Sequence, residues 1–202
     1  MMTNKNHWDN VYETKQPNEV SWTQEKPETS LRLIANCNLL KTAKIIDIGG
    51  GDSNLVDFLL KLGYTDLTVL DISEKAIEKA KIRLGKLAEK VKWIVSDITE
   101  FQPTDKYAIW HDRATFHFLT EKEQIEKYQT LVQNYVSNYL IIATFSTNGP
   151  LKCSGLEIKQ YSTADLENVF QNGFEKVEGF YEDHKTPFET IQNFVFVRFT
   201  KK

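Results

Sequence analysis

Short apolar runs alternate with amphipathic segments along most of this chain, and glycines or polar turns separate them. Apolar runs bounded by turn residues predict buried strands, and apolar positions that recur at helical spacing predict helices. This alternation is typical of an α/β protein with a parallel sheet. The predicted strands are residues 45–48, 67–70, 91–95, 107–110, 139–145, 174–181 and 194–200.

Capping residues mark the helices that follow these strands. The first predicted helix covers residues 53–62, directly after a run of glycines. Ser73 can cap the next helix, and Thr120-Glu-Lys-Glu123 has the pattern of a capping box. Ser162 starts a short helix that stops at Gly173. The apolar face of the helix after Ser73 is expected to hold Ile77, Ala80, Leu84 and Leu87.

The segment between the last two predicted strands contains Pro187 and no helical pattern. Parallel neighbours in a sheet need a long crossover, usually a helix, whereas antiparallel neighbours do not. The expected fold is therefore a doubly wound, mostly parallel, seven-stranded sheet that ends in an antiparallel C-terminal hairpin. Residues 146–155 contain Asn-Gly-Pro and Cys-Ser-Gly, which predict a long loop before the short helix.

Residues 44–52 read Lys-Ile-Ile-Asp-Ile-Gly-Gly-Gly-Asp, a strand that turns through glycines into a helix. Glycine lets a ligand approach the backbone, and a helix N-terminus after a strand is a place to hold a nucleoside-like ligand. Asp71 closes the next predicted strand, at the distance typical of a carboxylate that accepts hydrogen bonds from ribose hydroxyls.

The residues around the glycine turn discriminate between nucleoside cofactors. The dinucleotide fingerprint requires a third glycine at the position that Asn54 occupies. Asp47 and Asp52 flank the turn, and their negative charge would repel a diphosphate but attract an ammonium or sulfonium group. S-adenosylmethionine carries both of these cations and no phosphate, so it is the expected cofactor.

Three motifs at predicted strand ends resemble the successive cofactor motifs of class I S-adenosylmethionine-dependent methyltransferases. They are Asp47-Ile-Gly49-Gly50-Gly51, Asp71-Ile72 and Ser96-Asp97-Ile98. The resemblance covers nearly the whole chain and implies a Rossmann-like methyltransferase fold. It implies that Gly49 and Gly51 face the methionine part of the cofactor and that Asp71 binds the ribose. It also implies that Ile72 packs on the adenine, while Asp97 and Ile98 hold the adenine edge.

Ionisable residues gather where the fourth predicted strand ends at Trp110. Ligands of open α/β sheets bind beyond the carboxyl ends of the strands, so His111, Asp112 and Arg113 are expected in a loop facing this crevice, with His117 close behind. His111 or His117 could act as a general base, because histidine titrates near neutral pH. Asp112 could orient that base or hold the ammonium group of the cofactor. Arg113 could bind an acidic substrate or pair with Asp112.

The string Trp-His-Asp-Arg-Ala at residues 110–114 is similar to a small group of bacterial class I methyltransferases without an assigned substrate. It replaces the Asn/Asp-Pro-Pro-Tyr motif of enzymes that methylate amide or adenine nitrogens, which disfavours those acceptors. For His111, Asp112 and His117, a structural hydrogen bond is an equal alternative to a catalytic role.

Three large aromatic residues, Trp8, Tyr12 and Trp22, precede the first strand among polar residues. They are expected to be buried, either as a patch on the sheet edge or as a lid over cofactor and substrate. The lid interpretation resembles small-molecule methyltransferases of the thiopurine and tellurite-resistance type, and it adds Trp22 to the expected cofactor contacts. We expect one methyltransferase domain over residues 1–202, with a lid segment at 1–28 and a catalytic core at 44–202.

Composition narrows the choice of partners. The chain of 202 residues has a net charge of −3 and no basic block, which argues against a nucleic-acid partner. Cys37 and Cys153 lie far apart and predict neither a disulfide nor a metal site. The N-terminus lacks the apolar region of a signal peptide and no apolar run could span a bilayer, so we expect a cytoplasmic protein without a membrane partner.

The activity expected from these features is methyl transfer from S-adenosylmethionine to a small-molecule acceptor. A protein methyltransferase with a lysine acceptor is one alternative, and a non-catalytic S-adenosylmethionine-binding module is another. A nicotinamide oxidoreductase is disfavoured by Asp52 and Asn54, for the reasons given above.

Overall fold

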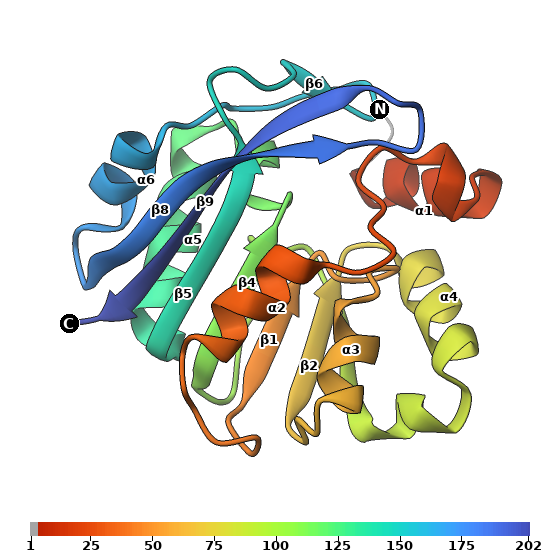
Figure 1. Cartoon of the computed structure of the whole chain (residues 1–202), viewed down its shortest axis with the longest axis horizontal. Helices are drawn as coiled ribbons and strands as arrows, with labels where there is room; N and C mark the ends of the chain where they lie inside the picture. Colours follow the sequence, from red (N-terminus) through yellow and green to blue (C-terminus); the bar gives the residue numbers. More distant parts are fainter. Residues whose placement is uncertain (1–3) are drawn as a thin grey trace.

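A computed structural model describes residues 4–202. Within these residues, a 7-stranded sheet has the order β3-β2-β1-β4-β5-β9-β8 (Figure 1). Strands β1 to β5 are parallel, and β9 runs antiparallel to both β5 and β8. The bounds are β1 Ile45–Ile48, β2 Leu67–Asp71, β3 Val91–Val95, β4 Tyr107–Arg113, β5 Val136–Phe145, β8 Phe174–Lys185 and β9 Ile191–Lys201. The predicted doubly wound sheet with an antiparallel C-terminal hairpin is confirmed.

Helices cover both faces of this sheet (Figure 1). One core joins α2 and α3 to the sheet, as Leu33 and Leu59 share it with Ile141 of β5. The other core joins α5 and α6, as Tyr128 and Phe170 share it with the adjacent residue of β5, Leu140. The helices are α1 Asn4–Thr14, α2 Glu28–Ala35, α3 Leu55–Lys61, α4 Glu74–Leu84, α5 Lys122–Tyr135 and α6 Thr163–Phe170.

The side chains of β4 alternate between these two cores. Ile109 belongs to the core beneath α2 and α3. Because successive side chains of a strand point to opposite faces, His111 and Arg113 lie on the same face of the sheet as Ile109, whereas Asp112 points toward α5. The parallel register pairs His111 with Asp47 of β1. Two ionisable residues of neighbouring strands therefore meet at the carboxyl edge of the sheet.

The predicted end of the fourth strand at Trp110 is wrong, because β4 continues through Arg113. The additional residues pair with β1 on one side and β5 on the other, and Asp112 is aligned with both Ile48 and Ile142. These pairings satisfy backbone N–H and C=O groups that would otherwise need water. The His-Asp-Arg string therefore lies in a strand and not in the expected loop.

Two predicted helix features are shifted along the chain. The N-cap of α5 is Glu121, whose backbone N–H donates to Gln124 Oε1 at 3.1 Å, so the capping box lies one residue later than predicted. Leu87 was predicted on the apolar face of the helix that Ser73 caps. It lies instead in a 3-10 turn and is exposed, because α4 ends at Leu84.

The segment before α6 is more ordered than a long loop. It contains a small hairpin of β6 Lys152–Cys153 and β7 Leu156–Glu157. The hairpin begins inside the predicted loop 146–155 and buries Cys153. Ser162 caps α6 as predicted, since its hydroxyl accepts a hydrogen bond from the N–H of Asp165.

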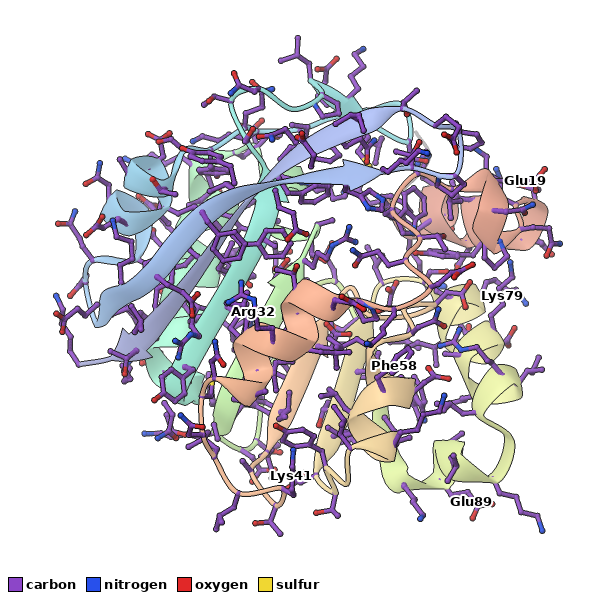
Figure 2. The ribbon with its side chains drawn as sticks, in the orientation of Figure 1. Glu19, Arg32, Lys41, Phe58, Lys79 and Glu89 are labelled. Carbon is purple, nitrogen blue, oxygen red and sulfur yellow. The ribbon has the colours of Figure 1, made fainter. Side chains whose placement is uncertain are left out.

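The N-terminal segment contributes α1 and α2, which the sequence pattern does not predict. α1 lies beside α4, and the hydroxyl of Ser73 donates to Asp9 Oδ1 at 2.7 Å. α2 lies against the sheet, and Arg32 on it reaches toward the antiparallel edge (Figure 2), with its Nη1 3.2 Å from Glu178 Oε2 of β8. No helix between residues 4 and 202 combines the length and apolar character needed to cross a bilayer.

Candidate active site

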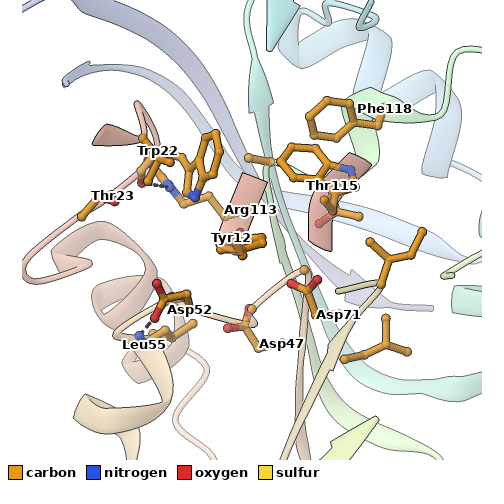
Figure 3. A pocket seen from close by; sticks show the side chains of 18 of the residues that line it. Tyr12, Trp22, Thr23, Asp47, Asp52, Leu55, Asp71, Arg113, Thr115 and Phe118 are labelled. Carbon is orange, nitrogen blue, oxygen red and sulfur yellow. Dashed lines mark hydrogen bonds between the residues drawn. The ribbon is translucent and has the colours of Figure 1, made fainter. Parts of the chain in front are cut away.

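A cavity of about 530 Å³ opens at the carboxyl edge of the sheet. The ends of the strands line one side of it, and the N-terminal segment lines another (Figure 3). Most of the residues predicted from the sequence line it, namely Trp22, Asp47, Gly49, Gly50, Asp71, Ile72, Asp97, Ile98 and His111. Gly51, Asp112 and His117 are not part of the lining.

The glycine turn is packed too closely to carry side chains. Gly49 has a φ of +67°, a left-handed conformation that glycine adopts without strain. A Cβ atom on Gly50 would lie 2.2 Å from Asp47 Oδ2, and one on Gly51 would lie 2.5 Å from the Cβ of Ala76. The backbone of Gly49 and Gly50 is therefore the surface that the turn offers to the cavity.

Asp47 brings a buried carboxylate to the centre of the site. Its Oδ1 lies 2.7 Å from His111 Nδ1, and the other ring nitrogen, Nε2, lies 2.9 Å from the hydroxyl of Ser30. Asp47 Oδ2 is buried and has no hydrogen-bond partner. An unpaired buried carboxylate oxygen is costly, so this atom is suited to a cationic or hydrogen-bond-donating ligand group.

His111 is held on both sides, which leaves neither ring nitrogen free for a substrate. Its role as a general base stays a prediction, and the contacts favour a residue that positions Asp47. Ser30 was missed by the sequence analysis. It lies on α2, whose position over β4 no local motif predicts.

Asp71 ends β2 and is bound to the glycine turn. Its Oδ2 accepts a hydrogen bond from the N–H of Gly51 at 2.9 Å, and its Oδ1 accepts one from the N–H of Ser73 at 2.8 Å. Burial raises the pKa of Asp71 to about 6, although both backbone N–H groups oppose that rise. Each oxygen keeps a second lone pair, so the carboxylate can still accept hydrogen bonds from a ligand in the cavity.

Asp97 extends this series of carboxylates beyond β3. Its Oδ1 accepts hydrogen bonds from both the N–H and the hydroxyl of Thr99, each at 2.8 Å. Ile72 and Ile98 line the same cavity. Apolar side chains together with a carboxylate can hold the flat face and the amino edge of a heterocycle.

Asp112 does not reach the cavity. It is fully buried toward α5, where its Oδ2 accepts from the hydroxyl of Tyr128 at 2.7 Å and its Oδ1 from the N–H groups of Thr115 and Phe116. Burial raises the pKa of Asp112 to about 6. These contacts support the structural alternative, a carboxylate that fixes the turn after β4.

His117 is also buried away from the cavity. Its ring stacks on Phe145 with centroids 4.6 Å apart, its Nδ1 accepts from the N–H of Phe145 at 3.4 Å, and its Nε2 has no partner. Burial, together with the nearby charge of Arg113, lowers the pKa of His117 to about 3. A neutral imidazole without access to the cavity is poorly placed to take a proton from a substrate.

His117 is expected to make the protein less stable in mild acid. Below pH 6.5 this imidazole is protonated in the unfolded chain, whereas in the folded protein it stays neutral down to about pH 3. Protonation therefore favours the unfolded state, and stability is lost as the pH falls from 6.5 toward 3. The free energy of unfolding should fall by about 1 kcal/mol between pH 7 and pH 5.5 from this residue. Urea denaturation of wild type and His117→Gln at several pH values measures the difference.

The two proteins should show parallel pH curves between pH 7.5 and 8.5, where the histidine is neutral in both states. Titration of all other groups is common to both, so the difference isolates His117. An equal slope in wild type and variant below pH 6.5 would show that the imidazole is not kept neutral by burial.

Aromatic side chains from the N-terminal segment close over the cavity. Trp8, Tyr12 and Trp22 contact one another, and Trp8 also packs on Phe118, with ring centroids 5.2 Å apart. Phe118 follows β4 and was missed by the sequence analysis. His184 of β8 holds the segment from the other side, with its Nε2 2.7 Å from the carbonyl oxygen of Ser21.

Residues 45–134 match the family described as "Methyltransferase domain". Malonyl-[acyl-carrier protein] O-methyltransferase of Anoxybacillus flavithermus is 38% identical over 82 residues, which are 40% of this chain and 30% of that protein. The eEF1A lysine and N-terminal methyltransferase of Mus musculus is 31% identical over 84 residues, 41% of this chain and 12% of that protein. The chain thus spans only 12% to 30% of the length of these curated relatives.

An S-adenosylmethionine-dependent methyltransferase of Anabaena variabilis has the same fold, with a TM-score of 0.76 and 13% identity. The superposition covers 98% of this chain and 93% of that one. The family match thus covers less than half of the chain, and the likeness to the Anabaena variabilis protein shows that the fold is shared.

Proposed function

We propose that this protein transfers a methyl group from S-adenosylmethionine to a small-molecule acceptor bound in the cavity. The observation that carries the proposal is the series of carboxylates Asp47, Asp71 and Asp97 at successive strand ends around one cavity. Negative charge at this place favours a cofactor with ammonium and sulfonium groups over one with phosphates. The family match of residues 45–134 supports the same cofactor.

The residues present suit this cofactor. The buried Asp47 Oδ2 has no partner and would accept a hydrogen bond from the methionine ammonium. The turn at Gly49 and Gly50 has no room for side chains, so its backbone can lie against the methionine chain. Asp71 would hold the ribose, and Asp97 with Ile72 and Ile98 would hold the adenine.

When bound, S-adenosylmethionine supplies an electrophilic methyl group on a sulfonium sulfur, and the protein need only align an acceptor with it. Of the three residues predicted as catalytic, His111 contributes by orienting Asp47. Asp112 and His117 stabilise the turn after β4. Within residues 4–202, no imidazole with a free ring nitrogen lines the cavity, so we propose an acceptor whose nucleophilic atom needs no strong base.

We further propose that residues 1–28 act as a lid over a catalytic core at residues 44–202, in one domain. The first three residues of this lid segment lie outside the described residues. The aromatic residues Trp8, Tyr12 and Trp22 line the cavity from this segment. A lid of this kind excludes water and limits the size of the acceptor, which favours a small molecule over a nucleic acid or a folded protein.

A protein acceptor is the second candidate, because the mouse relative is by name a lysine and N-terminal methyltransferase. One pair of assays distinguishes a small-molecule acceptor from a protein acceptor. Formation of S-adenosylhomocysteine is measured against a panel of metabolites that includes thiols and carboxylic acids. Cell lysate incubated with methyl-labelled cofactor is then examined on a gel for labelled protein. Turnover with protein alone would refute a small-molecule acceptor.

The experiment that tests the proposal itself is titration calorimetry of the purified protein with S-adenosylmethionine, with NAD as control. We expect micromolar binding of the sulfonium cofactor and none of NAD. Absence of S-adenosylmethionine binding, or tighter binding of NAD, would refute the cofactor assignment. Binding without any labelled product from lysate or metabolites would point to a non-catalytic binding module.

A further inference from the structure

The guanidinium of Arg113 lines the cavity without an acidic partner. It comes from the end of β4 and lies beside Trp22 (Figure 3). Its Nη1 donates to the carbonyl oxygen of Trp22 at 3.1 Å, whereas its Nε is buried and has no hydrogen-bond partner. Within residues 4–202, no carboxylate oxygen lies within 4.0 Å of this group. The predicted alternative, an ion pair with Asp112, is not formed.

Two carboxylates act on Arg113 at longer range, and neither forms an ion pair with it. They are Asp47 and Glu182. Asp47 is bound to His111, and Glu182 Oε2 accepts a hydrogen bond from the hydroxyl of Thr29 at 2.5 Å. Burial lowers the pKa of Arg113 to about 10, so the group stays charged at neutral pH. A charge held in a cavity without an acidic partner is costly unless a ligand compensates it.

Aromatic side chains lie around Arg113. Its Cζ lies 4.8 Å from the centre of the Phe194 ring. Phe118 and Phe145 line the same cavity. Cys153 lines it too, and burial raises the pKa of its thiol to about 12, so that it carries no charge.

We propose that Arg113 binds the carboxylate of the methyl acceptor, and that the acceptor is an aromatic carboxylic acid. This inference rests on the proposed function and names its substrate class. A guanidinium offers a planar set of donors that matches a carboxylate, and the unused Nε–H adds a donor to such a pair. Trp22, Phe118, Phe145 and Phe194 provide apolar walls for the ring of the acceptor.

The test compares matched ligands that differ only in charge. Protein saturated with S-adenosylhomocysteine is titrated with indole-3-acetate and indole-3-acetamide, and with phenylacetate and phenylacetamide. We expect the carboxylate of at least one pair to bind roughly tenfold or more tighter than its amide. Arg113→Gln should abolish this preference and Arg113→Lys should retain part of it, since lysine keeps the charge but not the planar donor set.

The control variant is Arg32→Gln, which removes an arginine outside the cavity and should keep the carboxylate preference. Affinity for S-adenosylmethionine should stay within about twofold in Arg113→Gln, because the carboxylate series remains intact. A large loss of cofactor affinity in this variant would overturn the proposal, since Arg113 would then hold the carboxylate of the cofactor itself. Absence of any carboxylate preference in the wild type, with or without ligand binding, would also overturn it. Failure of the proposed function would give a different result from failure of the Arg113 proposal, because the wild type would then not bind S-adenosylmethionine.

Discussion

Replacing Asp71 with alanine is expected to weaken S-adenosylmethionine binding by about 1–3 kcal/mol, which is roughly a 5- to 150-fold increase in Kd. The ribose hydroxyls would lose their acceptor. The glycine turn would also lose its anchor, because Asp71 accepts hydrogen bonds from the N–H groups of Gly51 and Ser73. Affinity should therefore fall both through the lost contact and through a looser turn.

Titration calorimetry measures the affinity, and a thermal melt shows that the variant is folded at the temperature of the titration. Asp66→Ala is the matched control. This carboxylate lies just before β2, at the amino ends of the strands and away from the cavity. Its Oδ2 is 4.0 Å from Lys44 Nζ. The control should bind the cofactor as the wild type does. Unchanged affinity in a folded Asp71→Ala variant would refute the ribose assignment.

Replacing Gly51 with alanine should damage both stability and cofactor binding. The new Cβ would meet the Cβ of Ala76 at 2.5 Å and Asp71 Oδ2 at 2.7 Å. Neither α4 nor the buried carboxylate can move freely, so the turn has to shift. Overpacking of this kind costs about 1–3 kcal/mol, or roughly 2–12 °C in Tm for a chain of this size. We expect the Kd for S-adenosylmethionine to rise by about tenfold or more, because Asp71 and the turn are displaced together.

Gly63→Ala separates the two effects. Gly63 has a φ of +86°, and a Cβ added there would have no neighbouring atom within 4 Å, so alanine at this position is strained but does not clash. The free energy of unfolding of the Gly63→Ala variant should fall by about 1–2 kcal/mol, because alanine is strained in the left-handed conformation. Its affinity for the cofactor should stay unchanged. A Gly51→Ala protein with wild-type Tm and Kd would show that the turn tolerates a side chain.

The cofactor end of the site could be predicted from local sequence. Asp47 lies within the first apolar run, Asp71 ends the second and Asp97 follows the third, and parallel strands bring their carboxyl ends to one edge. The run of three glycines after a strand is also visible in the local sequence, whereas the contacts that make the turn tight come from distant residues such as Asp71 and Ala76. The positions of the carboxylates and of the glycine run depend on the order of strands and turns, which the hydrophobic pattern predicts.

The acceptor end could not be predicted in the same way. The length of β4 decides where His111, Asp112 and Arg113 point, and that length depends on pairing with β1 and β5. Those partners are remote in the sequence. Ser30 and Phe118 reach the cavity for a similar reason, since α2 and the turn after β4 are placed by packing and not by a motif.

The sequence by itself determined the α/β class, the antiparallel hairpin and the series of carboxylates, because periodicity and turn chemistry are local properties of the chain. Tertiary structure alone decided which ionisable residues have access to a ligand. Alternation along β4 directs Asp112 to Tyr128 in the core and Arg113 to the cavity, and packing against Phe145 buries His117. Burial and hydrogen bonding set the protonation state of a side chain and decide whether it can contact a ligand. Both depend on residues that are distant in the sequence.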